Sequence, residues 1–230
     1  RAAQAVVALT GHTFPTVMTR TVERMLRAIG QKVGGELERR IESVLQDPTW
    51  ENLATLPLNE PERRMLYAMT RNTAVPTMIR GGHRINVIPS EVTVDVDGRI
   101  LPGQSPESFA AEVQALLGDL VEVALTSRSS ALEADPASPL FDTIRTVMQE
   151  LDPGSEVVPY LVPGGTDAKS LPGIKVYGFM PMRDHPEEFD LAHAHDERIS
   201  ISTLEFAVRA LFEIVTRFCH ARSADRVAAG

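Results

Sequence analysis

The chain has 230 residues, a formal net charge of -8, 43% hydrophobic residues and 23% charged residues. No apolar run approaches the roughly 18 residues that a membrane span needs, and the mixing of acidic and basic residues argues against nucleic acid as a partner. The length favours two domains, at about 100 to 200 residues each. The single cysteine, Cys219, cannot form an internal disulfide, so the sequence favours a cytoplasmic location.

The first half of the chain predicts a sandwich of helices on a sheet. The predicted elements are helices over 1–9 and 16–30, a helical insertion over about 31–70, strands over 73–80 and 86–101, a helix over 105–117 and a strand from Val121. With one more strand before Arg1, this is the order of a βαββαβ sandwich. Because Arg1 starts within an apolar helical pattern without an initiator Met or a cap, we expect an N-terminal region to be missing.

The second half of the chain predicts a different layer structure. Residues 129–138 are polar and contain proline, as an interdomain connection should. The elements predicted after it are a helix over 139–151, strands over 157–162 and 174–179, and a helix over about 202–219. Helices that alternate with apolar strands indicate a mostly parallel α/β layer. We therefore expect an α/β chain with two domains, 1–128 and 129–230.

One loop segment carries a candidate metal ligand. The sequence DLAHAHDERISIS, residues 190–202, places two histidines and two acids just before a helix. Histidine is the commonest metal ligand, and a neighbouring carboxylate can orient its ring. Taken alone, a His-x-His pair is more often a pair of exposed loop histidines. This segment therefore indicates a metal site only together with other motifs.

Two further segments offer candidate substrate contacts. In VPGGTDAKS, residues 162–170, glycines let backbone amides approach a ligand, and Thr166 offers a hydroxyl. An ordinary βα turn is an equally good interpretation of that segment alone. In IRGGHRINVIPSEVTVDVDGRILPG, residues 79–103, Asn86 and Arg99 offer an amide and a guanidinium for a substrate carboxylate. The alternative is that both side chains are simply solvated.

Together and in this order, the three segments resemble the dinuclear zinc hydrolases that include aminoacylase, acetylornithine deacetylase, succinyl-diaminopimelate desuccinylase and glutamate carboxypeptidase. The matching motifs are Gly-Gly-x-x-x-Asn-Val-Ile-Pro followed by Asp-x-Arg, then Gly-Gly-Thr-Asp-Ala, then His-x-x-Asp-Glu-Arg. The resemblance extends over about residues 1–220, although 31–70 carries no motif. It implies that 1–128 is a lid and dimerisation domain and that 129–230 is the C-terminal part of a zinc-peptidase catalytic domain.

The resemblance also implies roles for individual residues. His193 matches a metal ligand, whereas Asn86, Arg99, Gly165 and Thr166 match substrate contacts. In the family, two zinc ions, with cobalt or manganese as alternatives, activate a water and polarise the amide carbonyl. The implied substrate is a small acyl-amino acid or peptide with a free carboxylate, and the implied assembly is a homodimer formed through the lid domain.

The sequence lacks the other residues that this chemistry needs. The N-terminal half of the family would supply a His-x-Asp pair, a bridging Asp, a Glu-Glu pair and a lid histidine. None is found, because Glu187-Glu188 and His12 occupy the wrong places in the order of motifs. A lone imidazole cannot hold zinc, since a catalytic site needs about three protein ligands per ion. We therefore expect no catalytic residue in this chain and no activity from the chain alone.

Two alternatives to an enzyme fragment of this kind remain open. The chain could act as a non-catalytic binding or dimerisation module that pairs with a second copy through its lid-like sheet. It could also be an unrelated hydrolase with a His-Asp dyad, in which case Thr166 is the only nucleophile to consider beside His193. Neither alternative predicts a nucleic acid or a membrane as partner.

Overall fold

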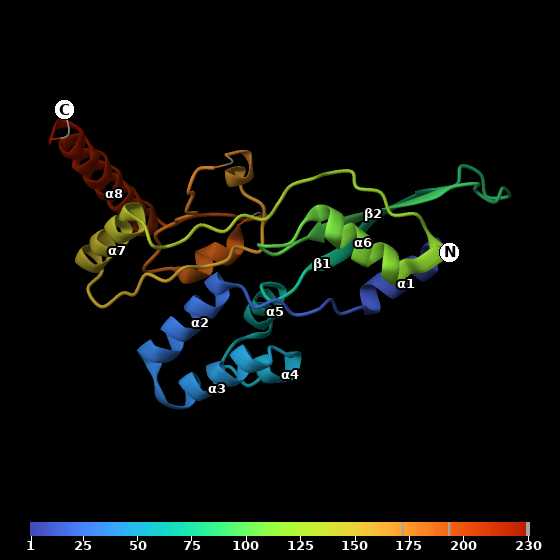
Figure 1. Cartoon of the computed structure of the whole chain (residues 1–230), viewed down its shortest axis with the longest axis horizontal. Coiled ribbons are helices and arrows are strands. Elements are labelled where there is room, and N and C mark those ends of the chain that lie inside the picture. The colour runs from blue at the N-terminus through green and yellow to red at the C-terminus, as the bar shows by residue number, and fades with distance from the viewer. Residues whose placement is uncertain (172, 193, 229–230) are drawn as a thin grey trace. The chain divides into compact units, whose positions relative to one another are not determined.

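The computed structural model describes residues 1–171, 173–192 and 194–228. The chain divides into two compact units (Figure 1). Unit 1 is Arg1–Glu133 with Pro159–Pro172, and unit 2 is Ala134–Val158 with Gly173–Gly230. Residues 159–172 thus pack with the first half of the chain, which the sequence order did not predict. Among the described residues, no helix is both long and apolar enough to span a bilayer.

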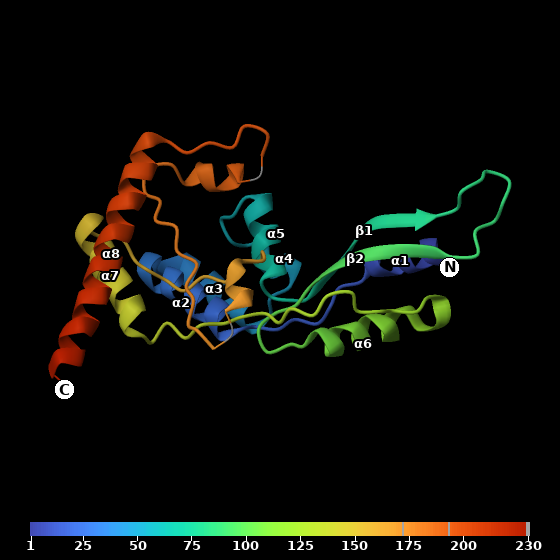
Figure 2. The same ribbon diagram turned by 90° about the horizontal axis from the view of Figure 1, so that it is seen from above.

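A two-stranded hairpin with two helices on one face forms the centre of unit 1. Strands β1 (Thr73–Gly81) and β2 (Val92–Arg99) pair antiparallel, with a register shift between Pro76 and Met78. Helices α1 (Ala2–Gly11) and α6 (Pro106–Leu117) lie on the same face of this hairpin (Figure 2). Their shared core consists of Ala5, Leu9, Phe14, Ala74, Phe109, Val113 and Leu117. This part matches the predicted order of helix, strand, strand, helix.

The predicted helix over 16–30 and the predicted helical insertion over about 31–70 are both present as short helices. They are α2 (Arg20–Val33), α3 (Gly35–Gln46), α4 (Trp50–Leu53) and α5 (Glu60–Ala68). Helix α2 starts at Arg20 rather than at 16, because the Thr19 side chain accepts a hydrogen bond from the backbone N–H of Val22 and caps the helix. Asn59 and Glu62 form a capping box at the start of α5. These helices have an apolar interior, since Leu53, Val22 and Val44 are fully buried.

Two packed helices form the core of unit 2. Helices α7 (Pro139–Leu151) and α8 (Ile201–Ala228) bury Ile144, Val147, Met148, Phe206, Ala210 and Ile214 between them. The outer side of α8 is apolar too, and it is exposed along at least four turns. The exposed residues are Ile201, Leu204, Val208, Leu211, Phe212 and Val215. Their spacing of three, four and one residues places them on one stripe of the helix.

The chain is α/β, as predicted, but three predicted strands do not join a sheet among the described residues. The segments 121–127, 157–162 and 174–179 are not paired with β1 or β2. For the first of them the reason is local: the Gln114 side chain donates to the carbonyl of Val121 and accepts from the N–H of Val123. A side chain thus satisfies backbone groups that a neighbouring strand would otherwise bond.

Candidate substrate-binding site

The loop that carries Asn86 forms the exposed tip of the hairpin. Residues 82–91 project beyond the paired ends of β1 and β2 (Figure 2). Asn86 is exposed, and its neighbours Ile85 and Ile88 are almost completely exposed, at 107% and 93%. Large apolar side chains held in solvent at a loop tip are uncommon in an isolated protein and indicate a surface that is covered in an assembly.

The two glycines at the start of this loop have separate structural reasons. A Cβ on Gly81 would lie 2.9 Å from Cγ2 of Val92, so the close approach of the strands requires glycine there. Gly82 has a φ of +76°, a backbone conformation that favours glycine even where a side chain would have room. The Gly-Gly pair is therefore explained by the geometry of the hairpin alone.

We expect Gly82→Ala to destabilise the chain by about 1 to 2 kcal/mol, because a Cβ is strained at positive φ. The measurement is urea-induced unfolding followed by circular dichroism. Gly11→Ala is the matched control: Gly11 ends α1, has no positive φ, and has nothing within 4 Å of its added Cβ. Equal effects of the two substitutions would contradict the strain argument.

Arg99 lies at the other end of the hairpin, at the last residue of β2. Its Nε donates to Oδ2 of Asp97 at 3.0 Å, and its Nη1 donates to the carbonyl of Pro163 at 2.6 Å. Pro163 directly precedes the Gly164-Gly165-Thr166 turn. The structure therefore brings together Arg99 and the turn with Gly165 and Thr166, which are 64 or more residues apart in sequence.

The turn that follows Pro163 is open. Thr166 is exposed, and it precedes a short 3-10 helix, Asp167–Ser170. No atom lies within 4 Å of the position that a Cβ on Gly165 would occupy, and the φ of Gly165 is not positive. Neither packing nor backbone strain among the described residues requires glycine at 165, so close approach of a ligand is an available reason for it.

Asn86 and Arg99 do not lie together. Strand β2 has eight residues, so at about 3.3 Å per residue the two side chains are separated by roughly 20 Å or more. One small molecule cannot contact both residues within a single copy of this hairpin.

His193 lies outside the described residues, and the residues around it are engaged in local contacts. Asp196 pairs with Nη1 of Arg198 at 2.6 Å. Glu188 accepts a hydrogen bond from the N–H of Ser200 at 2.8 Å, next to the start of α8. Desolvation raises the pKa of Glu188, but the hydrogen bonds from Ser200 and Thr203 outweigh it and the net shift is downward. Glu188 thus stabilises this helix start.

The described residues do not form a metal site. No group of three or more His, Cys, Asp and Glu side chains is close enough within 1–171, 173–192 and 194–228 to hold a metal ion. The donor set that zinc chemistry needs is therefore not assembled by the described part of the chain, and no reaction step through a metal follows from it.

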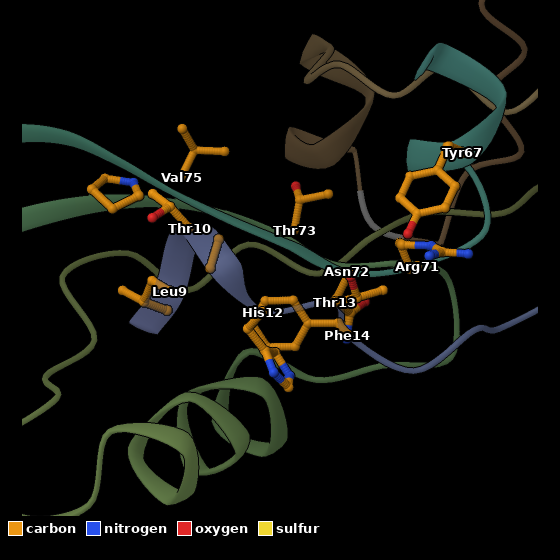
Figure 3. Close-up of a pocket in the computed structure, with 12 residues that line it drawn as sticks. Leu9, Thr10, His12, Thr13, Phe14, Tyr67, Arg71, Asn72, Thr73 and Val75 are labelled. Atoms are coloured by element: carbon orange, nitrogen blue, oxygen red, sulfur yellow. The ribbon is translucent and has the colours of Figure 1, made fainter. Parts of the chain in front are cut away.

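A cavity of about 270 Å³ lies between the end of α1 and the start of β1 (Figure 3). We call it the Arg71 cavity. It is lined by Leu9, Thr10, His12, Thr13, Phe14, Tyr67, Arg71, Asn72, Thr73, Ala74, Val75 and Pro76. No sequence pattern predicts this cavity, because Arg71 belongs to neither a helical nor a strand pattern. None of the lining residues is acidic.

The comparison with protein families decides which kind of chain this is. Residues 2–123 match the family model described as the M20 peptidase dimerisation domain. The chain belongs to the M20 peptidase family. This match confirms the family resemblance that the sequence motifs indicated.

Curated M20 relatives match the chain at low identity. Human N-fatty-acyl-amino acid synthase/hydrolase PM20D1 is 26% identical over 155 residues, which cover 64% of this chain and 31% of the relative. Probable carboxypeptidase S-like 1 of Dictyostelium discoideum is 30% identical over 145 residues, covering 59% and 29%. Pig (Sus scrofa) aminoacylase-1 is 26% identical over 131 residues, covering 54% and 31%. The chain thus spans about a third of the length of these M20 proteins, all of which bear the names of hydrolases or peptidases.

One solved M20 structure is similar to the chain. It is a metallo-carboxypeptidase, Sso-CP2, from Sulfolobus solfataricus, with a TM-score of 0.44 and 15% sequence identity, covering 73% of this chain and 40% of that one. A similarity at this level carries no further argument about the site.

Proposed function

We propose that the chain is the lid and the C-terminal catalytic part of a zinc-dependent M20 hydrolase that cleaves an amide bond of a small acyl-amino acid or peptide with a free carboxylate. Residues 1–128 would be the lid and 129–230 the catalytic part. The observation that carries the proposal is the contact of Arg99 with Pro163, because it joins the lid arginine to the Gly-Gly-Thr turn. A cytoplasmic location belongs to the same proposal.

Arg99 has the donors that a substrate carboxylate needs. A guanidinium has five N–H bonds, and Asp97 and Pro163 use one on Nε and one on Nη1. The other N–H of Nη1 and both of Nη2 have no acceptor among the described residues, so a carboxylate can bind end-on to the two terminal nitrogens. The backbone of Gly165 and the hydroxyl of Thr166 lie in the adjoining turn and would bind a second oxygen of the substrate.

Asn86 would reach the same substrate from a second copy of the chain. Its distance from Arg99 along β2 rules out a shared small ligand within one hairpin, whereas a two-fold dimer can bring the tip of one lid to the base of another. The match to a peptidase dimerisation domain supports a homodimer, and the exposed Ile85 and Ile88 supply apolar surface beside Asn86 for such an assembly.

The catalytic groups would come from residues that are not in this chain. The exposed apolar stripe of α8 supports this, because six large apolar side chains on one side of a helix call for a further protein layer. His193 would contribute one ligand to a zinc ion whose remaining ligands belong to that layer. This chain alone would be inactive.

The decisive experiment compares this chain with one that is extended at its N-terminus. Zinc content and hydrolysis of N-acetyl-amino acids would be measured on both. We expect the extended chain to bind zinc and to release amino acid, and the 230-residue chain to do neither. An extended, folded chain that holds no zinc and cleaves no acyl-amino acid would overturn the hydrolase proposal.

A non-catalytic dimerisation module is the second candidate, and the exposed hairpin tip favours it. Sedimentation equilibrium and the hydrolysis assay test it together: a stable dimer of the short chain whose extended form cleaves no acyl-amino acid supports a module that assembles by itself. A dimer whose extended form cleaves acyl-amino acids instead favours the enzyme.

A further inference from the structure

Arg71 is a buried arginine in a rigid position. Its exposed fraction is 5%. Its backbone forms an isolated antiparallel bridge with Thr16, and the N–H of Val17 donates to the carbonyl of Thr70 at 2.7 Å. The guanidinium carbon lies 3.3 Å from the centre of the Tyr67 ring, and Figure 3 shows Arg71 next to Tyr67 at one end of the Arg71 cavity.

The charge of Arg71 has no carboxylate partner among the described residues. Its Nη2 donates to the carbonyl of Pro48 at 2.9 Å and makes longer contacts with hydroxyls of Thr16 and Thr70. Its Nε is buried and has no hydrogen-bond partner, and no bond from Nη1 is seen within the described part of the chain. Burial lowers the pKa of Arg71, yet an arginine stays protonated at neutral pH.

A buried cation with unpaired donors calls for an anion. Buried charges in proteins are normally paired, because taking an ion out of water without a partner costs free energy. Water could bond to the donors but would leave the charge uncompensated. Since no acidic residue lines the Arg71 cavity, the anion has to come from outside the described residues.

The rest of the cavity selects the kind of anion. Leu9, Val75 and Phe14 provide apolar surface, and Figure 3 shows Leu9 and Val75 at the end away from Arg71. A volume of about 270 Å³ is near the lower limit of small-molecule sites. A single guanidinium at one end and apolar walls at the other match one carboxylate on a short hydrocarbon tail better than a doubly charged phosphate.

We propose that the Arg71 cavity binds a small monocarboxylate, with its carboxylate on Arg71 and its apolar tail along Leu9, Phe14 and Val75. This site is separate from the substrate contacts proposed above, because Arg99 does not line the cavity. It stands or falls independently of the hydrolase proposal.

The test is calorimetric binding of hexanoate to the 230-residue chain, with hexanamide as an uncharged ligand of the same shape and inorganic phosphate as a doubly charged ligand. We expect hexanoate to bind at least about tenfold more tightly than either, since hydrogen bonds between charged groups are the strong ones. Arg71→Met should abolish this preference, whereas Arg80→Met, which removes an exposed arginine of the hairpin that pairs with Asp95, should leave it unchanged.

Two measurements keep the test decisive if Arg71→Met does not fold. Val75→Phe narrows the end of the cavity that would hold the apolar tail. It should weaken the binding of hexanoate and leave the binding of acetate, which has no long tail, unchanged. In nitrogen-resolved NMR spectra, the arginine N–H signal that shifts most on adding hexanoate should be the slowly exchanging one of buried Arg71. Equal binding of hexanoate and hexanamide, preferential binding of phosphate, or an unchanged preference for hexanoate in Arg71→Met would overturn the inference.

Discussion

Phe109→Ala should destabilise unit 1 by about 3 to 5 kcal/mol, a large part of the stability of a domain this size. Phe109 is 6% exposed and belongs to the core shared by α1, α6 and β1. Its ring meets Phe14 edge to face with centroids 5.0 Å apart, and its Cε1 lies 3.3 Å from the place of a Cβ on Gly98. Removing the ring therefore leaves a cavity that the rigid hairpin cannot close. Thermal and urea unfolding of the variant measure the loss.

Phe212→Ala is the matched control for this prediction. It removes the same ring from α8, where Phe212 is 67% exposed, so we expect a change within about 0.5 kcal/mol. A large loss from Phe212→Ala with a small loss from Phe109→Ala would contradict both the assigned core and the exposure of the α8 stripe.

The elements that the sequence predicts well are those fixed by local pattern. The alternation of Val92, Val94 and Val96 with polar residues predicts β2, and the capping residues set the helix starts. The strand predicted from Val121 fails because pairing is not local: an extended segment becomes a strand only when another strand is beside it. Gln114 instead bonds the backbone there, and no pattern in residues 121–127 reveals that.

The candidate site, like the fold, is predicted only in part from the sequence. Motifs select Arg99, Gly165 and Thr166, and the structure brings Arg99 next to the turn that holds the other two. The motifs do not reveal that Asn86 lies at the opposite end of the hairpin, because separation in space depends on the strand between them. Arg71 is missed entirely, since the burial of a charged residue depends on packing from α1, α5 and β1 that no single segment encodes.

Arg99→Met should lower kcat/KM of the N-terminally extended enzyme by about 10- to 150-fold, the loss expected when hydrogen bonds between charged groups are removed. The prediction rests on the proposed role of Arg99 in binding the substrate carboxylate. Hydrolysis of an N-acetyl-amino acid is the assay. Arg80→Met is the matched control, because Arg80 is a half-exposed arginine of the same hairpin that pairs with Asp95 at 2.7 Å. We expect the control to retain its activity, and equal losses would contradict a specific role of Arg99.

A mixture of variants tests whether Asn86 and Arg99 act across a dimer. If each site combines Arg99 of one copy with Asn86 of the other, a hybrid of Asn86→Ala and Arg99→Met subunits has one intact site and one doubly substituted site. Random exchange of subunits makes half of the dimers hybrids, so activity should rise to about a quarter of the wild-type value, although each variant alone is nearly inactive. If both residues came from one copy, every site in the hybrid would carry one substitution and mixing would restore nothing. The roughly 20 Å along β2 between the two residues favours the first outcome.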